Sequence, residues 1–208
     1  SSYYPLYIGD GKSWNSKGKV VIAGRKRYPT RHESDMFTNT STANTSSYIR
    51  ALRKGTIFDG AIHFHNLRPI ELGALLSAIT FHNQADCYHN LGAGKPLGYG
   101  KVKITVNLEG TDVDGNKVSN LKQYLDIFKT TMDQWLKSDW LNAPSNVELF
   151  GMARGIPQGK GNQFQYMKMT IGAGNNNSEF KNGKDEYAKG KRLGKFTEII
   201  TNKISQVI

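Results

Sequence analysis

The chain has 208 residues, of which 38% are hydrophobic, and this is enough for one sizeable domain or two small ones. Its formal net charge of +11 favours a polyanionic partner, because clustered Lys and Arg side chains displace counterions from phosphates; the alternative is a basic protein with no specific partner. The single cysteine, Cys87, excludes a disulfide framework or a zinc site built on several thiolates, and the lack of a long apolar run predicts no membrane partner.

The beginning of the chain combines a short β-prone run, residues 19–23, with a basic cluster. The cluster contains four cations around one aromatic ring: Arg25, Lys26, Arg27, Tyr28 and Arg31. Residues 34–47 are rich in Ser, Thr and Asn, a composition that predicts a long loop.

Residues 61–108 show a strand, helix, strand pattern. Residues 61–66 alternate and predict a strand with Ile62 and Phe64 on its buried face. Pro69 and Glu71 suit the first turn of a helix, and Leu72, Leu75, Leu76 and Ile79 form one apolar stripe on it. Residues 101–108 alternate again, with a basic face. The pattern predicts a right-handed βαβ unit.

The second half of the chain predicts a turn-rich link at 110–117 and two further helices. We expect Ser119 to cap the first helix, whose apolar face carries Leu121, Leu125, Phe128, Met132 and Trp135. Ser145 and Glu148 fit a capping box for a short helix that Gly155 and Pro157 end. Residues 164–171 predict a strand, and Ile199, Ile200, Ile204 and Val207 predict a C-terminal helix.

The glycine-rich loop at 91–100 matches no mononucleotide or dinucleotide fingerprint. A Walker A loop needs Ser or Thr after Gly-Lys, whereas Pro96 follows Lys95 here. A helix precedes the loop and a strand follows it, the reverse of the order that aims a helix N-terminus at a phosphate. The glycines therefore let the backbone approach a close neighbour, which is either the protein's own sheet or an RNA backbone. Lys95, Tyr99, Lys101 and Lys103 favour nucleic acid.

Four segments of this region together resemble the C-terminal signature of the RAMP superfamily of CRISPR-associated proteins: GAIHFHNL, PIELGALLSAI, HNLGAGKPLGYG and KVKI. The upstream GRKRYP resembles a basic motif of type III RAMP proteins. The resemblance is close across residues 55–108 and looser across 19–31 and 145–171. It implies an α+β, ferredoxin-like (RRM-related) fold with an added helical segment, and CRISPR RNA binding within a multi-subunit antiviral complex in the cytoplasm.

A RAMP protein usually has an N-terminal ferredoxin-like half before this signature, and the chain starts with Ser1 rather than Met. We therefore expect a C-terminal portion of a longer protein, or a chain that folds with another polypeptide. The predicted parts are 1–54 (basic strand and Ser/Thr-rich loop), 55–171 (ferredoxin-like RAMP domain), 172–195 (flexible Gly/Asn/Lys-rich segment) and 196–208 (C-terminal helix).

Catalysis is a second possibility, because RNA cleavage without metal needs a general base and a general acid, often histidines. The candidates are His32, His63, His65, His82 and His89. His89 is the best placed of them because it adjoins the glycine loop, and the spacing of His82, Cys87 and His89 fits no common zinc site. Asp35 is the one acidic candidate, by analogy with target-cleaving RAMP subunits. Ordinary solvated side chains are the alternative for all of these, and the sequence favours binding.

The resemblance, together with the basic residues around the loop, therefore implies a CRISPR RNA-binding subunit with no cofactor and no metal. Gly92, Gly94, Gly98 and Gly100 would admit the RNA backbone, and Lys95, Lys101 and Lys103 would meet phosphates. Arg25, Lys26, Arg27 and Arg31 would form a second basic patch, while Tyr28 and Tyr99 would stack on bases. The alternatives are a RAMP-type endoribonuclease that processes CRISPR transcripts and a structural subunit that contacts only protein neighbours.

Overall fold

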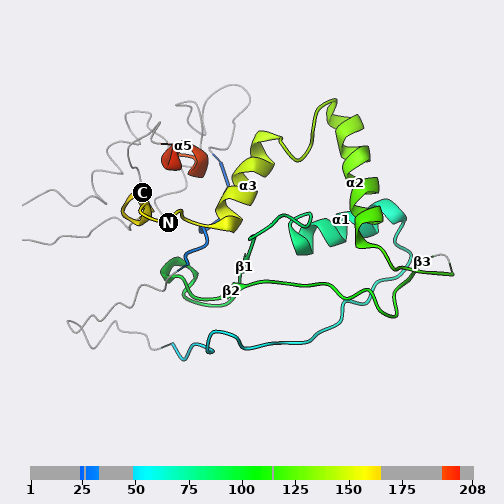
Figure 1. Cartoon of the computed structure of the whole chain (residues 1–208), viewed down its shortest axis with the longest axis horizontal. Helices are drawn as coiled ribbons and strands as arrows, with labels where there is room; N and C mark the ends of the chain where they lie inside the picture. The colour runs from blue at the N-terminus through cyan, green and yellow to red at the C-terminus, as the bar shows by residue number, and fades with distance from the viewer. Residues whose placement is uncertain (1–23, 26, 33–48, 114, 165–193, 202–208) are drawn as a thin grey trace, which may run out of the picture. The chain divides into compact units, whose positions relative to one another are not determined.

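In a computed structural model of the chain, the structure describes residues 24–25, 27–32, 49–113, 115–164 and 194–201 (Figure 1). These residues form helices and two small antiparallel sheets, which confirms the predicted α+β class. The chain divides into two compact units, Thr30–Asn146 and a second made of Ser1–Pro29 with Val147–Ile208. Several predicted features lie outside the described residues: those of 19–23, 34–47, 165–171 and 172–193, and those of Lys26 and Asp35.

Helix α1 (Pro69–Thr80) forms where the sequence predicts it. Pro69 occupies the first turn, where no intrahelical donor is needed, and the Glu71 carboxylate accepts a 2.8 Å hydrogen bond from the Arg68 backbone N–H. Leu72 and Leu76 are 1% and 3% exposed, so the predicted stripe faces the core. The helix ends at Phe81, which adopts a left-handed conformation with φ of 53°.

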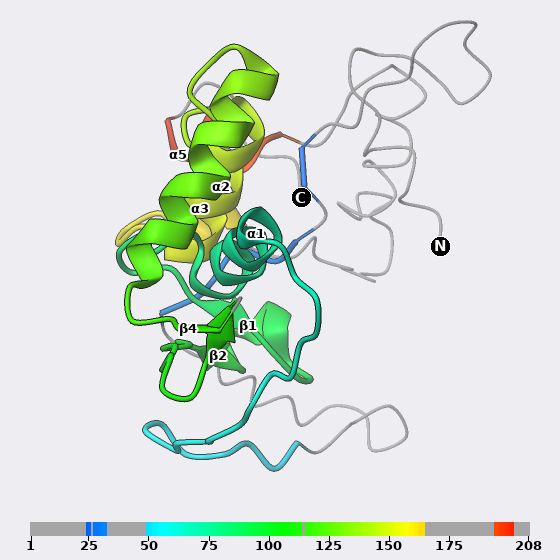
Figure 2. The same cartoon turned by 90° about the vertical axis from the view of Figure 1, so that its right-hand side faces the viewer.

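Helix α2 (Leu121–Leu136) packs beside α1 (Figure 2). Its cap is Asn120 and not Ser119, because the Asn120 side-chain oxygen accepts a 3.0 Å hydrogen bond from the N–H of Lys122. Trp135 is 75% exposed, so its predicted place in the core is wrong. The cluster shared with α1 takes its α2 residues from Leu121–Leu125, at the start of the helix, and Trp135 lies ten residues further along.

A glycine sets the spacing between these two helices. A Cβ atom on Gly73 of α1 would lie 2.1 Å from the backbone oxygen of Tyr124 in α2, far inside van der Waals contact. The helices therefore touch through backbone at this point. Around it lies the core of the Thr30–Asn146 unit, formed by Leu72, Leu76, Val113, Val118, Tyr124 and Leu125.

Each of the two sheets is a two-stranded antiparallel pair. Strand β1 (His89–Asn90) pairs with β2 (Lys101–Val102), and β3 (Asp112–Val113) pairs with β4 (Asn116–Lys117) across the predicted turn. The predicted parallel βαβ unit is wrong for the described residues, since 61–66 and 103–108 join no ladder. β2 pairs instead with the segment directly before the loop, because an antiparallel partner needs only a short connection.

The two segments that the βαβ prediction assigned to strands still contribute to the core. Phe64, Val106 and Leu108 pack against the α1–α2 cluster, whereas Ile62 is 60% exposed, contrary to its predicted burial. Without a paired neighbour, the alternation of residues 61–66 does not produce one uniformly buried face.

The second unit contains α3 (Pro144–Arg154) from Val147 onward, the 3-10 turn η3 (Gly161–Phe164) and α5 (Phe196–Ile200). Gly155, with φ of 104°, follows the last residue of α3 as predicted. The capping box is wrong, because the helix already begins before Ser145 and Glu148 is 4% exposed. Phe164 belongs to η3 rather than to a strand. The core here comprises Met152, Ile156, Phe164, Phe196 and Ile199.

Glu148 has a long-range partner instead of a local one. Its carboxylate accepts hydrogen bonds from the backbone N–H of Phe196, from the N–H of Thr197 at 3.1 Å and from the hydroxyl of Thr197 at 2.8 Å. It therefore caps the first turn of α5, the predicted C-terminal helix, which the described residues show over Phe196–Ile200. No helix in the described ranges is long and apolar enough to span a bilayer.

Candidate nucleic-acid interface

The glycine-rich loop, residues 91–100, connects β1 to β2 and is closed by its own backbone. The N–H of Leu91 donates to the carbonyl oxygen of Gly100 at 2.8 Å. Gly100 has φ of 73°, and a Cβ atom there would lie 1.7 Å from the Leu91 oxygen. The close neighbour that requires a glycine at this position is therefore the loop itself.

The middle of the loop is a tight turn as well. Lys95–Leu97 form one 3-10 turn, η2, flanked by Gly94 and Gly98 with φ of 74° and 88°. The Gly94 carbonyl accepts from the N–H of Leu97 at 2.9 Å and from that of Tyr99 at 3.2 Å. A Cβ on Gly94 would lie 3.1 Å from the Tyr99 ring. Gly92, with φ of 77°, is different, because a Cβ there would meet nothing within 4 Å.

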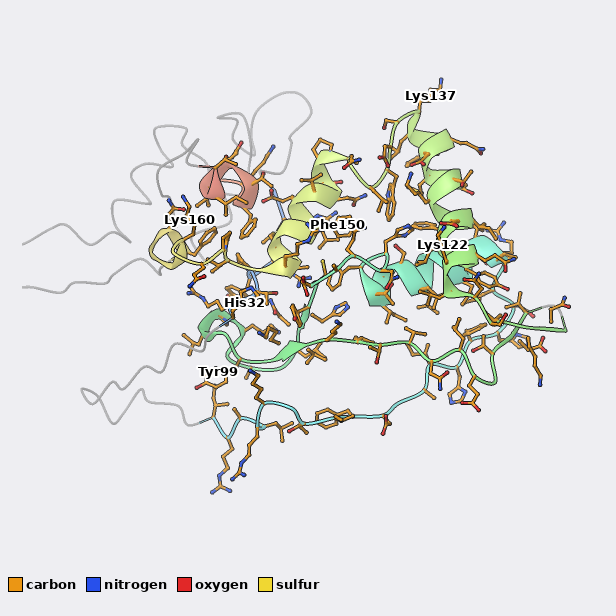
Figure 3. The ribbon with its side chains drawn as sticks, in the orientation of Figure 1. His32, Tyr99, Lys122, Lys137, Phe150 and Lys160 are labelled. Carbon is orange, nitrogen blue, oxygen red and sulfur yellow. The ribbon has the colours of Figure 1, made fainter. Side chains whose placement is uncertain are left out.

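The predicted cations of the hairpin differ in exposure. Lys101 on β2 and Lys103 just beyond it are exposed, whereas Lys95 and Tyr99 in the loop are half-buried. Figure 3 labels Tyr99. Lys101 is also held in place, since its Nζ lies 5.0 Å from the centroid of the Tyr88 ring in a cation–π contact. Lys101 and Lys103 are therefore the hairpin residues best able to meet phosphates.

The predicted second basic patch is not brought together with the loop in one unit. Arg31 belongs to the Thr30–Asn146 unit with the hairpin, whereas Arg25, Arg27 and Tyr28 belong to the other unit. Tyr28 is 48% exposed. Arg31 is therefore the member of the predicted patch that shares a unit with the hairpin.

His89, the leading catalytic candidate, has a positioning role in the structure. Its Nε2–H donates to the carbonyl oxygen of Ile79 at 2.7 Å, and its ring lies against Phe81 with centroids 4.3 Å apart. These contacts attach the start of β1 to the end of α1. The hydrogen bond to a carbonyl also fixes the tautomer that carries a proton on Nε2.

The other histidines fall into two groups. His82 is buried, with Nδ1 3.2 Å from the Ser77 hydroxyl and its ring edge-to-face with Trp140, and burial lowers its pKa from 6.5. His63 and His65 are exposed, as is His32. Cys87 is buried, and within the described part of the chain no three His, Cys, Asp or Glu side chains gather as metal ligands would.

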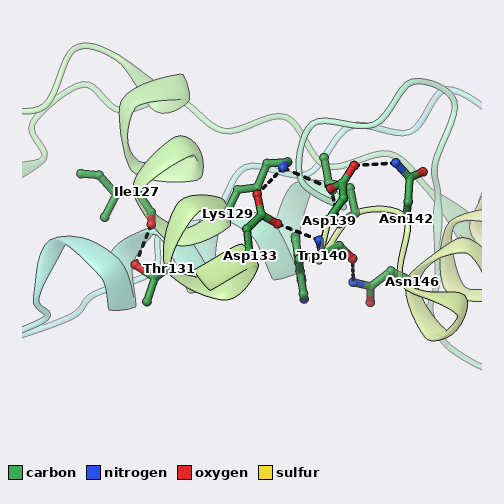
Figure 4. Close-up of polar contacts among 9 residues, drawn as sticks. Ile127, Lys129, Thr131, Asp133, Asp139, Trp140, Asn142 and Asn146 are labelled. Carbon is green, nitrogen blue, oxygen red and sulfur yellow. Dashed lines mark hydrogen bonds and ion pairs between the residues drawn. The ribbon is translucent and has the colours of Figure 1, made fainter. Parts of the chain in front are cut away.

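A polar network at the end of α2 surrounds the backbone of Trp140 (Figure 4). The Trp140 ring meets the His82 ring edge-to-face. Lys129 Nζ lies 2.5 Å from an Asp133 oxygen and 3.1 Å from an Asp139 oxygen. The hydrogen bond to Lys129 lowers the pKa of Asp133, whose other oxygen accepts a 2.7 Å bond from the Trp140 N–H. This network positions the scaffold and lies outside the predicted site.

Sequence reasoning missed three residues at the hairpin, namely Thr30, Tyr88 and Asn90. Thr30 is fully buried, and its hydroxyl donates to the side-chain oxygen of Asn90 on β1 at 3.2 Å. Tyr88 supports Lys101 and contacts the ring of His32. The available signal was the run of Tyr88, His89 and Asn90 directly before the loop. Protein-family models, curated proteins and solved structures give no significant match to the chain.

Proposed function

We propose that the chain is a CRISPR RNA-binding subunit, or the C-terminal portion of one, in a type III effector complex, and that the β1–β2 hairpin is its RNA contact. The observation that carries this proposal is a pair of exposed cations at the end of a hairpin that closes on itself: Lys101, which lies over the Tyr88 ring, and Lys103 just beyond β2. A net charge of +11 adds long-range attraction for a polyanion. The choice of CRISPR RNA follows from the RAMP-like segments at 55–108.

The ferredoxin-like RAMP fold is part of the same proposal. Residues 61–66 and 103–108 join no ladder among the described residues, so this part of the proposal depends on where the two segments pack. Support comes from the packing of Phe64, Val106 and Leu108 against the cluster of α1 and α2, because both segments contribute to one core.

The glycines have a different role in this proposal from the lysines. Gly94 and Gly100 pack against the loop's own atoms, so they shape the hairpin and leave phosphate contact to the lysines. Gly92 has open space beside it, and it remains a candidate for close approach of the RNA backbone.

The test is filter binding of a CRISPR repeat RNA to the chain and to Lys101→Glu and Lys103→Glu variants over a range of salt concentrations. Each lysine that contacts a phosphate contributes about 0.7 to the slope of log K against log salt for single-stranded RNA. We expect both variants to bind more weakly and with a shallower slope. Lys137→Glu is the control, since this lysine is exposed at the C-terminal end of α2, away from Tyr99 (Figure 3).

Equal affinities for the chain and both variants would refute the hairpin as the RNA contact. No RNA affinity at all, together with a stable complex with another CRISPR-associated subunit, would favour the structural-subunit alternative. Cleavage of the repeat RNA in the absence of metal would favour the endoribonuclease alternative.

A further inference from the structure

Two aromatic rings meet beside the hairpin from distant parts of the sequence. His32 and Tyr88 lie with ring centroids 6.4 Å apart and planes at 86°, an edge-to-face arrangement. The bond from Thr30 to Asn90 holds the segment of His32 against β1, although the two bonded residues are 60 positions apart. The contact between the His32 and Tyr88 rings, called the His32–Tyr88 corner below, is therefore part of the folded structure.

The His32 side of this corner is exposed. A perpendicular contact covers at most one face of either ring, and His32 is exposed. Lys101 lies over the Tyr88 ring with its Nζ 5.0 Å from the centroid, and Lys101 is exposed as well. The three side chains thus offer an imidazole face for stacking beside a positioned ammonium group.

That combination matches one nucleotide of a single strand. A base has a π face that stacks on an aromatic ring whatever its sequence, and the phosphate next to it carries the charge that an ammonium attracts. In a duplex the bases stack on each other and their faces are covered. A cation already held over Tyr88 also loses less freedom on meeting a phosphate than a mobile lysine does.

We propose that His32, Tyr88 and Lys101 form a stacking site for one unpaired base of a bound RNA strand, with Lys101 on the adjacent phosphate. This inference rests on the RNA-binding function proposed above. The proposal assigns His32 to base stacking rather than to catalysis. It also moves the stacking role from Tyr99, which packs against Gly94, to the His32–Tyr88 corner.

The experiment compares binding of a short single-stranded oligoadenylate that contains a fluorescent adenine analogue with binding of the matched RNA duplex. His32→Ala should weaken single-strand binding roughly five- to hundredfold, the range for losing one base–aromatic stack, with no change in the salt slope. Lys101→Ala should weaken binding and reduce the slope by about 0.7. His32→Tyr should restore the affinity and the quenching of the analogue. His63→Ala is the matched control, because it removes another exposed histidine of the same unit.

The outcomes separate this inference from the function on which it rests. If no RNA binds to the unaltered chain, both are wrong. If RNA binds and the lysine variants weaken it, but His32→Ala and His32→Tyr bind as tightly as the unaltered chain, the stacking site is wrong and the RNA-binding function stands. Equal affinity for the single strand and the duplex would also overturn the stacking site.

Discussion

Replacing Gly100 with Ala tests whether the glycine loop closes on itself. The matched variant is Gly92→Ala, because the two glycines have nearly the same φ, 73° and 77°, but different surroundings. Both substitutions carry the penalty of placing a Cβ in the left-handed region, about 1–2 kcal/mol. Only at Gly100 does the new atom overlap a backbone oxygen, that of Leu91, at 1.7 Å.

The difference between the two variants follows from that overlap. Overpacking of this kind costs about 1–3 kcal/mol. Moving the Leu91 carbonyl also breaks the bond from its N–H to Gly100, which adds about 1 kcal/mol. We therefore expect Gly100→Ala to destabilise the closed loop by about 2–4 kcal/mol more than Gly92→Ala does.

Hydrogen exchange at the Leu91 amide is the direct measurement, because the loop can open without global unfolding. Exchange of this amide should be much faster in Gly100→Ala than in Gly92→Ala, while amides inside α1 stay protected in both. Equal exchange rates at Leu91 in the two variants would refute the closed hairpin.

Three further substitutions test the scaffold. Gly73→Ala should destabilise the protein to urea by up to about 2 kcal/mol, because the overlap with the Tyr124 backbone is set against a gain in helix propensity of about 1 kcal/mol; a stabilised variant would contradict the close helix contact. Burial lowers the pKa of His82, so the unfolded state binds the proton more tightly and stability is lost as pH falls from the ordinary value of 6.5 through the lowered one. His82→Gln should flatten this part of the stability–pH curve. An unchanged curve would show that His82 does not cause the loss of stability at low pH. Glu148→Gln should cost about 1–2 kcal/mol and speed exchange of the Phe196 amide, whereas unaltered exchange would mean that the carboxylate does not cap α5.

Local signals predicted the parts of the fold that depend on neighbouring residues. α1 was predictable because Pro69, Glu71 and the leucine stripe all act within one helix. The start of α2 was misplaced by one residue because Ser119 and Asn120 are both good caps, and only the three-dimensional path of the chain selects between them.

Long-range contacts are where sequence reasoning failed. Glu148 lies three residues after Ser145, as a capping box requires, yet its carboxylate caps a helix that begins 48 residues later. For the glycine loop, sequence spacing showed that a close neighbour was needed but not that the neighbour is the Leu91 carbonyl. The His32–Tyr88 corner depends on a bond between residues 60 positions apart, which no local pattern reveals.

Closure of the hairpin and the position of its cation are linked, and this gives a last prediction. Lys101 is paired with Asn90 in the β1–β2 register and follows Gly100 directly, so opening the loop releases the lysine from its place over Tyr88. Lys101→Glu should therefore weaken RNA binding less in a Gly100→Ala background than in the unaltered chain, whereas in a Gly92→Ala background its effect should be undiminished. A double-mutant cycle in the filter-binding assay measures this coupling. Strictly additive effects of Gly100→Ala and Lys101→Glu would show that the loop glycines do not position the RNA-binding lysine.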